Sequence, residues 1–188
     1  MNVTMTKTRR LTEGAIMVAL ATILSLIKFD LPTGGGVTLC AMLPIVFMAY
    51  RHGTKWGVFT AFVFSVLQLF LGLDNVHYAS SAMMAVGIVL FDYIIAYTVI
   101  GFAGIFKGKF KNARIDIVAG TITTLFARFL CHFITGWFIW DRLYPNEMGL
   151  TAPIYSFVYN GSYMLVEIII TSIVAALIVK WANYGMDK

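Results

Sequence analysis

The chain has 188 residues, of which 60% are hydrophobic and only 12% are charged, and its mean hydropathy is +0.83. Because a soluble domain typically carries about 25% charged residues, this composition predicts a single integral membrane domain and excludes a separate soluble one. The formal net charge is +5. The basic residues gather beside alternate apolar segments, so they indicate membrane topology and require no nucleic-acid partner.

Six apolar segments follow one another along the chain. They cover roughly residues 11–29, 37–50, 58–73, 78–106, 115–140 and 153–182. A helix needs about 20 residues to cross ~30 Å of hydrocarbon. These lengths predict an all-α membrane protein, a six-transmembrane-helix bundle. The second segment is short and follows the run Gly34-Gly35-Gly36, so we expect its outer end to be irregular.

Basic residues are distributed unevenly between the two sides of this bundle. Only Lys28 and Arg142 fall on the side of the first, third and fifth loops. By the positive-inside rule, the opposite, basic side is cytoplasmic and so are both termini. The basic side carries Lys7, Arg9, Arg10, Arg51, Lys55, Lys107, Lys109, Lys111, Arg114, Lys180 and Lys188.

Polar side chains interrupt the last three segments at Asp92, Arg128, His132, Asn160 and Glu167. An ionisable group inside a membrane is unfavourable and usually faces a partner or a cavity. With a helical rise of about 1.5 Å per residue, His132 and Asn160 share one level in the outer leaflet. Arg128 and Glu167 share a deeper level near the midplane. We expect Arg128 and Glu167 to form a structural ion pair; the alternative is that they belong to the binding site.

Asp92, followed by Tyr93, has no basic neighbour in the outer leaflet other than His132. A buried carboxylate needs a cation or several donors, and a cationic ligand would satisfy it. Aromatic faces nearby favour stacking and cation–π contact, although packing in the core explains any single one of them. The pocket therefore suits a small, flat, positively charged molecule. These aromatic residues are Tyr93, Trp137, Trp140, Tyr155, Tyr159 and Tyr163.

Motifs for catalysis are absent from the sequence. There is no phosphate-binding Gly-x-x-x-x-Gly-Lys-Ser/Thr, no His-Glu-x-x-His and no Gly-x-Ser-x-Gly, so we expect neither ATP hydrolysis nor another enzymatic activity. Cys40 and Cys131 lie in apolar runs without further ligands and predict no metal site. Ala15 and Ala19 form a small-xxx-small pair, which lets helices approach closely.

Several motifs together resemble the thiamine-specific S-component, the substrate-binding membrane subunit, of energy-coupling-factor (ECF) transporters. They are Leu11-Thr12-Glu13 with Ala15 and Ala19, Met42-Leu43-Pro44, Asp92-Tyr93, His132-Phe133-Ile134-x-Gly136 with Trp140, and Tyr155-Ser156-x-x-x-Asn160-Gly161-Ser162-Tyr163. The resemblance implies a multi-pass protein of the bacterial plasma membrane that binds thiamine from outside without a cofactor. A transmembrane coupling subunit and two cytoplasmic ATPase subunits use ATP to drive uptake.

The resemblance also assigns residues. It implies thiamine binding by Asp92, Tyr93, His132, Trp140, Tyr155 and Asn160, with weaker candidates Tyr78, Trp137, Tyr163 and Gly35. It places the docking surface for the coupling subunit on Ala15 and Ala19. Two positions depart from the pattern: Asp92 replaces a glutamate, and the glycine run near Gly35 replaces a tryptophan. The alternatives are an S-component for hydroxymethylpyrimidine or pyridoxine, an independent secondary transporter, or, least favoured, a membrane enzyme.

Overall fold

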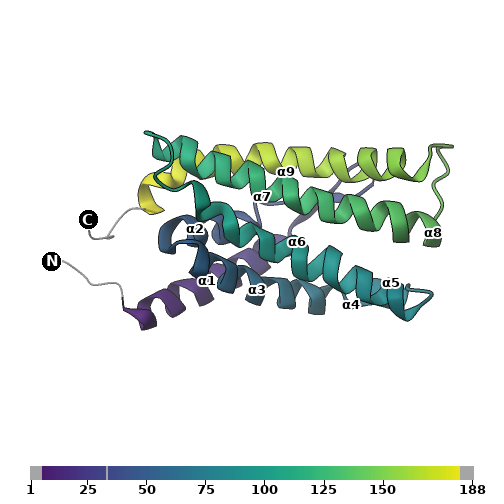
Figure 1. The fold of residues 1–188 in the computed structure, drawn as a ribbon, viewed down its shortest axis with the longest axis horizontal. Coiled ribbons are helices and arrows are strands. Elements are labelled where there is room, and N and C mark those ends of the chain that lie inside the picture. Colours follow the sequence, from purple (N-terminus) through teal and green to yellow (C-terminus); the bar gives the residue numbers. More distant parts are fainter. Residues whose placement is uncertain (1–5, 33, 183–188) are drawn as a thin grey trace.

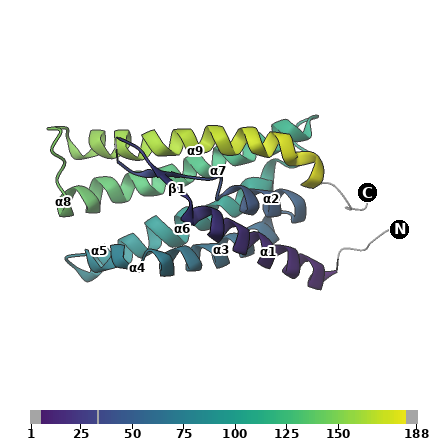
Figure 2. The same cartoon turned by 180° about the vertical axis from the view of Figure 1, so that it is seen from behind.

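The computed structural model describes residues 6–32 and 34–182, which form a bundle of helices aligned roughly along one axis (Figure 1). Two long helices, α7 (Ala113–Thr135) and α9 (Ala152–Ala182), pack against each other. Helix α1 (Lys7–Leu26) begins, and α9 ends, at the same end of the bundle (Figures 1 and 2). The predicted helical class is therefore confirmed for the described residues.

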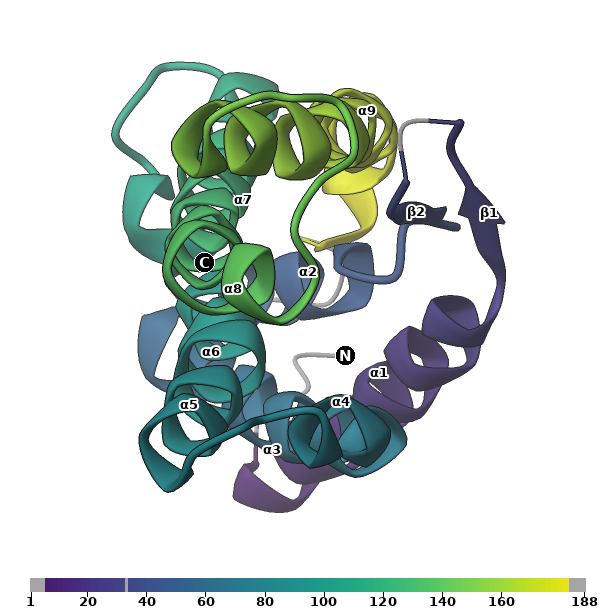
Figure 3. The same cartoon turned by 90° about the vertical axis from the view of Figure 1, so that its right-hand side faces the viewer.

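A β-hairpin separates the first two predicted segments. Strand β1 (Lys28–Asp30) pairs in antiparallel with β2 (Gly36–Thr38), and end-on the hairpin lies between α1 and α9 (Figure 3). Gly34 and Gly35 have φ angles of 86° and 72°, a region that residues with a side chain rarely adopt. The predicted helix at 11–29 is therefore wrong at its end, which enters this hairpin, whereas the irregular start expected for 37–50 is confirmed.

Helix α2 (Leu43–His52) begins in the second predicted segment and has only ten residues. Pro44 occupies its first turn, where the missing amide hydrogen has no helical partner in any case. Its ten residues rise about 15 Å, half the hydrocarbon thickness. Ile45, Val46 and Met48 are fully buried, so α2 is an interior helix. Gly53 alone separates it from α3 (Thr54–Leu71).

The fourth predicted segment is helical from Ala82 and not from Tyr78. A short helix, α4 (Leu73–His77), precedes it, and Ser81 caps the new helix by accepting a hydrogen bond from the amide of Met84 at 3.3 Å. The helix then changes its winding along its length. Its parts are α5 (Ala82–Gly87), the π-helical η1 (Ile88–Ile94), α6 (Ile95–Thr98) and the 3-10-helical η2 (Val99–Phe106).

The fifth predicted segment also contains a π-helical part. Helix α7 passes into η3 (Gly136–Trp140) and then α8 (Asp141–Leu143). Among the described residues, four helical stretches are long and apolar enough to cross a membrane. They are Thr54–Leu71, Ala82–Phe106, Ala113–Leu143 and Ala152–Ala182.

A charged cluster closes the end of the bundle where α1 begins. Arg51 Nε donates to Glu13 Oε2 at 2.8 Å, and Arg51 Nη1 donates to the carbonyl oxygen of Ala182 at 3.0 Å. Lys107 Nζ donates to the carbonyl oxygen of Arg51 at 3.2 Å. Burial, and to a smaller extent the Arg51 charge, lowers the pKa of Lys107. These bonds fasten α1, α2 and α9 together at the end opposite the hairpin.

Candidate ligand-binding site

A cavity of about 690 Å³ lies in the half of the bundle that contains the hairpin. Its walls come from β1–β2, the α3–α4 turn, η1, the end of α7 with η3, and the start of α9. Most residues singled out from the sequence line it: Gly35, Asp92, Tyr93, Arg128, His132, Trp140, Tyr155, Asn160, Tyr163 and Glu167. Tyr78 and Trp137 are not among its lining residues. Tyr78 lies edge-on against Tyr144, and Trp137 stacks on Phe138.

Asp92 is the centre of a compact hydrogen-bond cluster. Its Oδ1 accepts from His132 Nδ1 at 3.0 Å and from the hydroxyl of Thr135. Its Oδ2 accepts from Trp140 Nε1 at 2.8 Å. The carboxylate therefore has three protein donors, and His132 is the one basic side chain among them, as the sequence indicated. Thr135 was missed, although its place three residues after His132 puts it on the same helical face.

Two residues of this cluster, from two different helices, lie in π-helical segments. Asp92 belongs to η1, and Trp140 is the last residue of η3. A π-helical turn changes the direction of the side chains that follow it and is frequent at functional sites. The two unusual turns thus bring a carboxylate and an indole from separate helices into contact.

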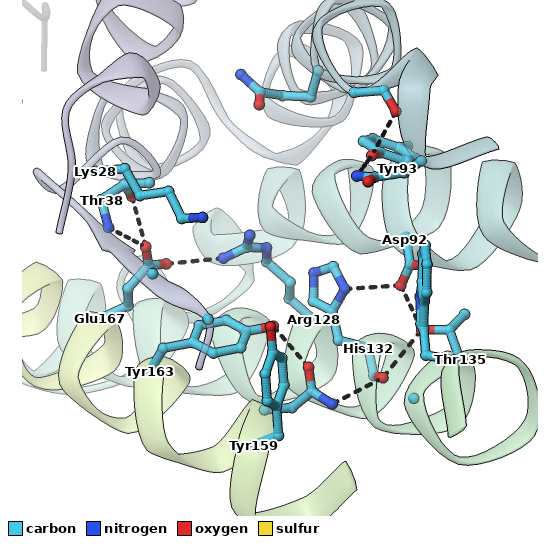
Figure 4. Close-up of a pocket in the computed structure, with 18 of the residues that line it drawn as sticks. Lys28, Thr38, Asp92, Tyr93, Arg128, His132, Thr135, Tyr159, Tyr163 and Glu167 are labelled. Atoms are coloured by element: carbon cyan, nitrogen blue, oxygen red, sulfur yellow. Dashed lines mark hydrogen bonds and ion pairs between the residues drawn. The ribbon is translucent and has the colours of Figure 1, made fainter. Parts of the chain in front are cut away.

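His132 is oriented by Asp92. A carboxylate only accepts hydrogen bonds, so Nδ1 of His132 carries the hydrogen in this contact. Nε2 is buried and has no hydrogen-bond partner among the described residues. Figure 4 shows the ring between Asp92 and Arg128. Nε2 therefore has hydrogen-bonding capacity that no described protein group uses.

Asn160 contacts His132 through the backbone. Its Nδ2 donates to the carbonyl oxygens of Ser156 at 3.0 Å and of His132 at 3.2 Å, and its Oδ1 accepts from the hydroxyl of Tyr163 at 2.8 Å. The two residues do share one level of the bundle, as their depths indicate. Both the nitrogen and the oxygen of the Asn160 amide are therefore hydrogen-bonded to protein groups. The bond to Oδ1 also fixes the hydroxyl of Tyr163.

Tyr93 connects the cavity to the opposite wall. Its hydroxyl donates to the carbonyl oxygen of Gly72 at 3.0 Å and accepts from Asn75 Nδ2 at 2.7 Å. A side chain at Gly72 would collide with this hydroxyl, because a Cβ there would lie 2.1 Å from it. The ring is thus fixed by the α3–α4 turn.

Arg128 and Glu167 form an ion pair, with Nη1 2.9 Å from Oε2. Arg128 Nη2 also donates to the hydroxyl of Tyr97 at 3.2 Å. Glu167 Oε1 accepts from the amide and the hydroxyl of Thr38, at 2.8 and 2.6 Å. The pair also lines the same cavity as Asp92 (Figure 4), so whether it supports the fold or contacts the ligand stays a prediction. It also anchors β2.

Close packing against α9 explains why Gly34 and Gly35 have no side chain. A Cβ at Gly34 would lie 2.4 Å from the ring of Tyr159, and one at Gly35 would lie 2.5 Å from the ring of Tyr163. The hairpin backbone therefore lies directly on two tyrosine rings of α9, which excludes larger residues there.

Ala15 and Ala19 lie away from this cavity. Both are exposed on α1, whose buried residues are Gly14, Val18 and Ala21. They line a second, smaller groove of about 380 Å³ between α1 and α3, together with Trp56 and Phe59. The small-residue pair thus belongs to the surface and not to the interior of the bundle.

Known proteins resemble this chain over nearly its whole length. The family described as "Thiamine transporter protein (Thia_YuaJ)" matches residues 11–185. The thiamine transporter ThiT of Bacillus subtilis (strain 168) is 30% identical over 181 residues, which cover 90% of this chain and 89% of that protein. ThiT of Lacticaseibacillus paracasei is 27% identical and covers 90% of this chain and 86% of its own length.

A solved structure also has this fold. ThiT from Listeria monocytogenes superposes with a TM-score of 0.76 at 22% sequence identity, covering 95% of this chain and 97% of that one. The family match over most of the sequence, supported by the relatives' identity, decides the assignment. The chain belongs to the thiamine transporter protein family.

Proposed function

We propose that this protein is the thiamine-binding S-component of an ECF-type uptake transporter. It captures thiamine from outside the cell and passes it to an ATP-driven partner module. The observation that carries the proposal is the Asp92 carboxylate, held by three donors inside a cavity rich in aromatic side chains. Membership of the thiamine transporter family supports the same ligand.

Thiamine matches the chemistry of this cavity. We place its thiazolium cation beside Asp92, because Tyr93 and Trp140, which line the same cavity, offer aromatic faces there. Its aminopyrimidine carries donors and acceptors for His132 Nε2, for the hydroxyl of Tyr155 and for the second lone pair of Asn160 Oδ1. A cavity of about 690 Å³ is within the usual range of ~300–1,000 Å³ for small-molecule sites.

The membrane arrangement follows from the four spanning helices and from the charges. The family and the apolar helices make this a multi-pass protein of the cell membrane. We infer that α1, and α2 together with the hairpin, bring the number of crossing segments to six. The excess of basic residues at the α1 end supports a cytoplasmic position for that end and for both termini. The cavity then opens on the outer side.

The partners are a transmembrane coupling subunit and two cytoplasmic ATPases. This chain is a transporter component and not an enzyme, so ATP hydrolysis belongs to the partners. The exposed Ala15 and Ala19 lie in a groove that a partner helix can enter, because small side chains permit close approach. We therefore assign docking to this face of α1.

Calorimetric titration tests the ligand. We expect the purified protein to bind thiamine at least tenfold more tightly than pyridoxine or hydroxymethylpyrimidine, a difference of about 1.4 kcal/mol or more, because neither competitor has a permanent cation for Asp92. Tighter binding of hydroxymethylpyrimidine or pyridoxine would show that the chain is a sister S-component for that ligand.

Substitution of the small pair tests docking. In Ala15→Trp and Ala19→Trp, a bulky ring fills the groove, so assembly with the coupling subunit and ATP-driven uptake in vesicles should fail. Both residues lie outside the cavity, so thiamine affinity of the isolated variants should stay within about twofold of the original. Leu20→Trp is the control, because Leu20 is also exposed on α1 but does not line the groove and lies on another face of the helix. Normal uptake by both alanine variants would contradict the assignment.

A further inference from the structure

Thr135 is a cavity-lining residue to which the proposed function gives no role. It is the last residue of α7 and only 1% exposed. Its hydroxyl bonds to Oδ1 of Asp92, the oxygen that also accepts from His132. Trp140 bonds to the other oxygen, Oδ2. Thr135 is therefore one of two groups that determine where Oδ1 lies.

Other buried threonines of α7 show what this hydroxyl does differently. Thr121 and Thr124 each donate to the carbonyl oxygen four residues earlier at 2.8 Å, the usual bond of a helical threonine. The hydroxyl oxygen of Thr135 lies 3.4 Å from the carbonyl oxygen four residues earlier, that of Cys131, and 3.1 Å from the carbonyl oxygen of His132. A hydroxyl has one hydrogen to donate, and a carboxylate is the stronger acceptor. The hydrogen of Thr135 is thus directed to Asp92.

We propose that Thr135 is a positioning residue that fixes the Asp92 carboxylate in the orientation that receives the cationic ring of the ligand. This inference rests on the proposed function. With Thr135 in place, both carboxylate oxygens are fixed before ligand enters. Without the Thr135 hydroxyl, His132 is the one remaining donor to Oδ1. The carboxylate can then rotate, which also disturbs the hydrogen bond from Trp140 to Oδ2. Binding then includes the cost of ordering the carboxylate.

Three variants separate this role from simple packing. Thr135→Val keeps the shape and removes the hydroxyl; it should weaken thiamine binding about 10- to 100-fold, the usual effect of losing a hydrogen bond to a charged group. Thr135→Ser keeps the hydroxyl and should bind within about threefold of the original. Thr124→Val removes an equally buried hydroxyl that bonds only to its own helix and should leave affinity unchanged.

A second measurement does not need the ligand. The indole N–H resonance of Trp140 reports its bond to Asp92, and that of Trp137 serves as an internal reference. Thr135→Val should shift the Trp140 resonance, Thr135→Ser should restore it, and Thr124→Val should leave it in place. If Thr135→Val does not fold, Thr135→Ala gives the same comparison.

The two proposals fail in different ways. If the original protein does not bind thiamine, the proposed function falls, and the Trp140 resonance still decides whether Thr135 positions Asp92. A folded Thr135→Val with an unshifted Trp140 resonance overturns the inference. So does a Thr135→Val variant that binds thiamine as well as the original.

Discussion

Asp92→Asn should weaken thiamine binding by about 2–5 kcal/mol, the cost of removing one partner of a buried charge pair, or at least thirtyfold. The substitution keeps the size of the side chain and removes the charge proposed to face the thiazolium. It also turns one acceptor oxygen into a donor, which opposes either Trp140 Nε1 or the donors on Oδ1. Calorimetry measures the loss.

Two comparisons isolate the charge in this experiment. Hydroxymethylpyrimidine lacks the cation, so its affinity should fall much less in Asp92→Asn than that of thiamine. Asp141 lines the same cavity but accepts from Asn146 Nδ2 at 3.2 Å, and Asp141→Asn should change thiamine affinity by less than about threefold. Equal losses for both ligands in Asp92→Asn would rule out the charge role.

Breaking the Arg128–Glu167 pair should cost ~3–5 kcal/mol of stability, because each single change leaves an uncompensated charge in the interior. The side chains are 7% and 4% exposed. Arg128→Met or Glu167→Leu should therefore lower the melting temperature strongly. Loss of Glu167 also leaves the amide of Thr38 without its acceptor. The double variant should recover much of the loss, since it removes both charges together.

An exposed pair in the same region provides the control. Lys28 and Asp30 form an ion pair at 3.2 Å with side chains 54% and 81% exposed, and Asp30→Asn should change stability by less than about 1 kcal/mol. Thermal unfolding in detergent compares all the variants. If Arg128→Met melted normally but lost thiamine binding, the pair would be part of the ligand site and not a structural support.

Helical geometry explains which contacts could be anticipated from the sequence. The rise per residue is constant along a helix, so counting from the helix ends places Asn160 opposite His132 and Glu167 opposite Arg128. The structure has both pairs in contact. Whether His132 and Asn160 bind thiamine stays a prediction, because contact between them does not identify a ligand.

Departures from regular helical winding explain what could not be anticipated. The π-helical turns η1 and η3 set the directions of Asp92 and Trp140, and a periodicity of 3.6 residues gives no sign of them. The hairpin pairs only Lys28–Asp30 with Gly36–Thr38. In the sequence, strands this short next to apolar runs cannot be distinguished from the ends of the neighbouring helices. The position of the hairpin depends on Tyr159 and Tyr163, more than 120 residues later in the chain.

The distance between the thiazolium ring and the Asp92 carboxylate in a thiamine-bound crystal structure tests the central claim most directly. We expect thiamine in the cavity formed by η1, α7, η3 and α9, with the ring within ~4–6 Å of the carboxylate, the range over which opposite charges favour each other's ionised forms. The Asp92 bonds to His132, Thr135 and Trp140 should remain. Thiamine bound outside this cavity, or with its cation directed away from Asp92, would contradict the account.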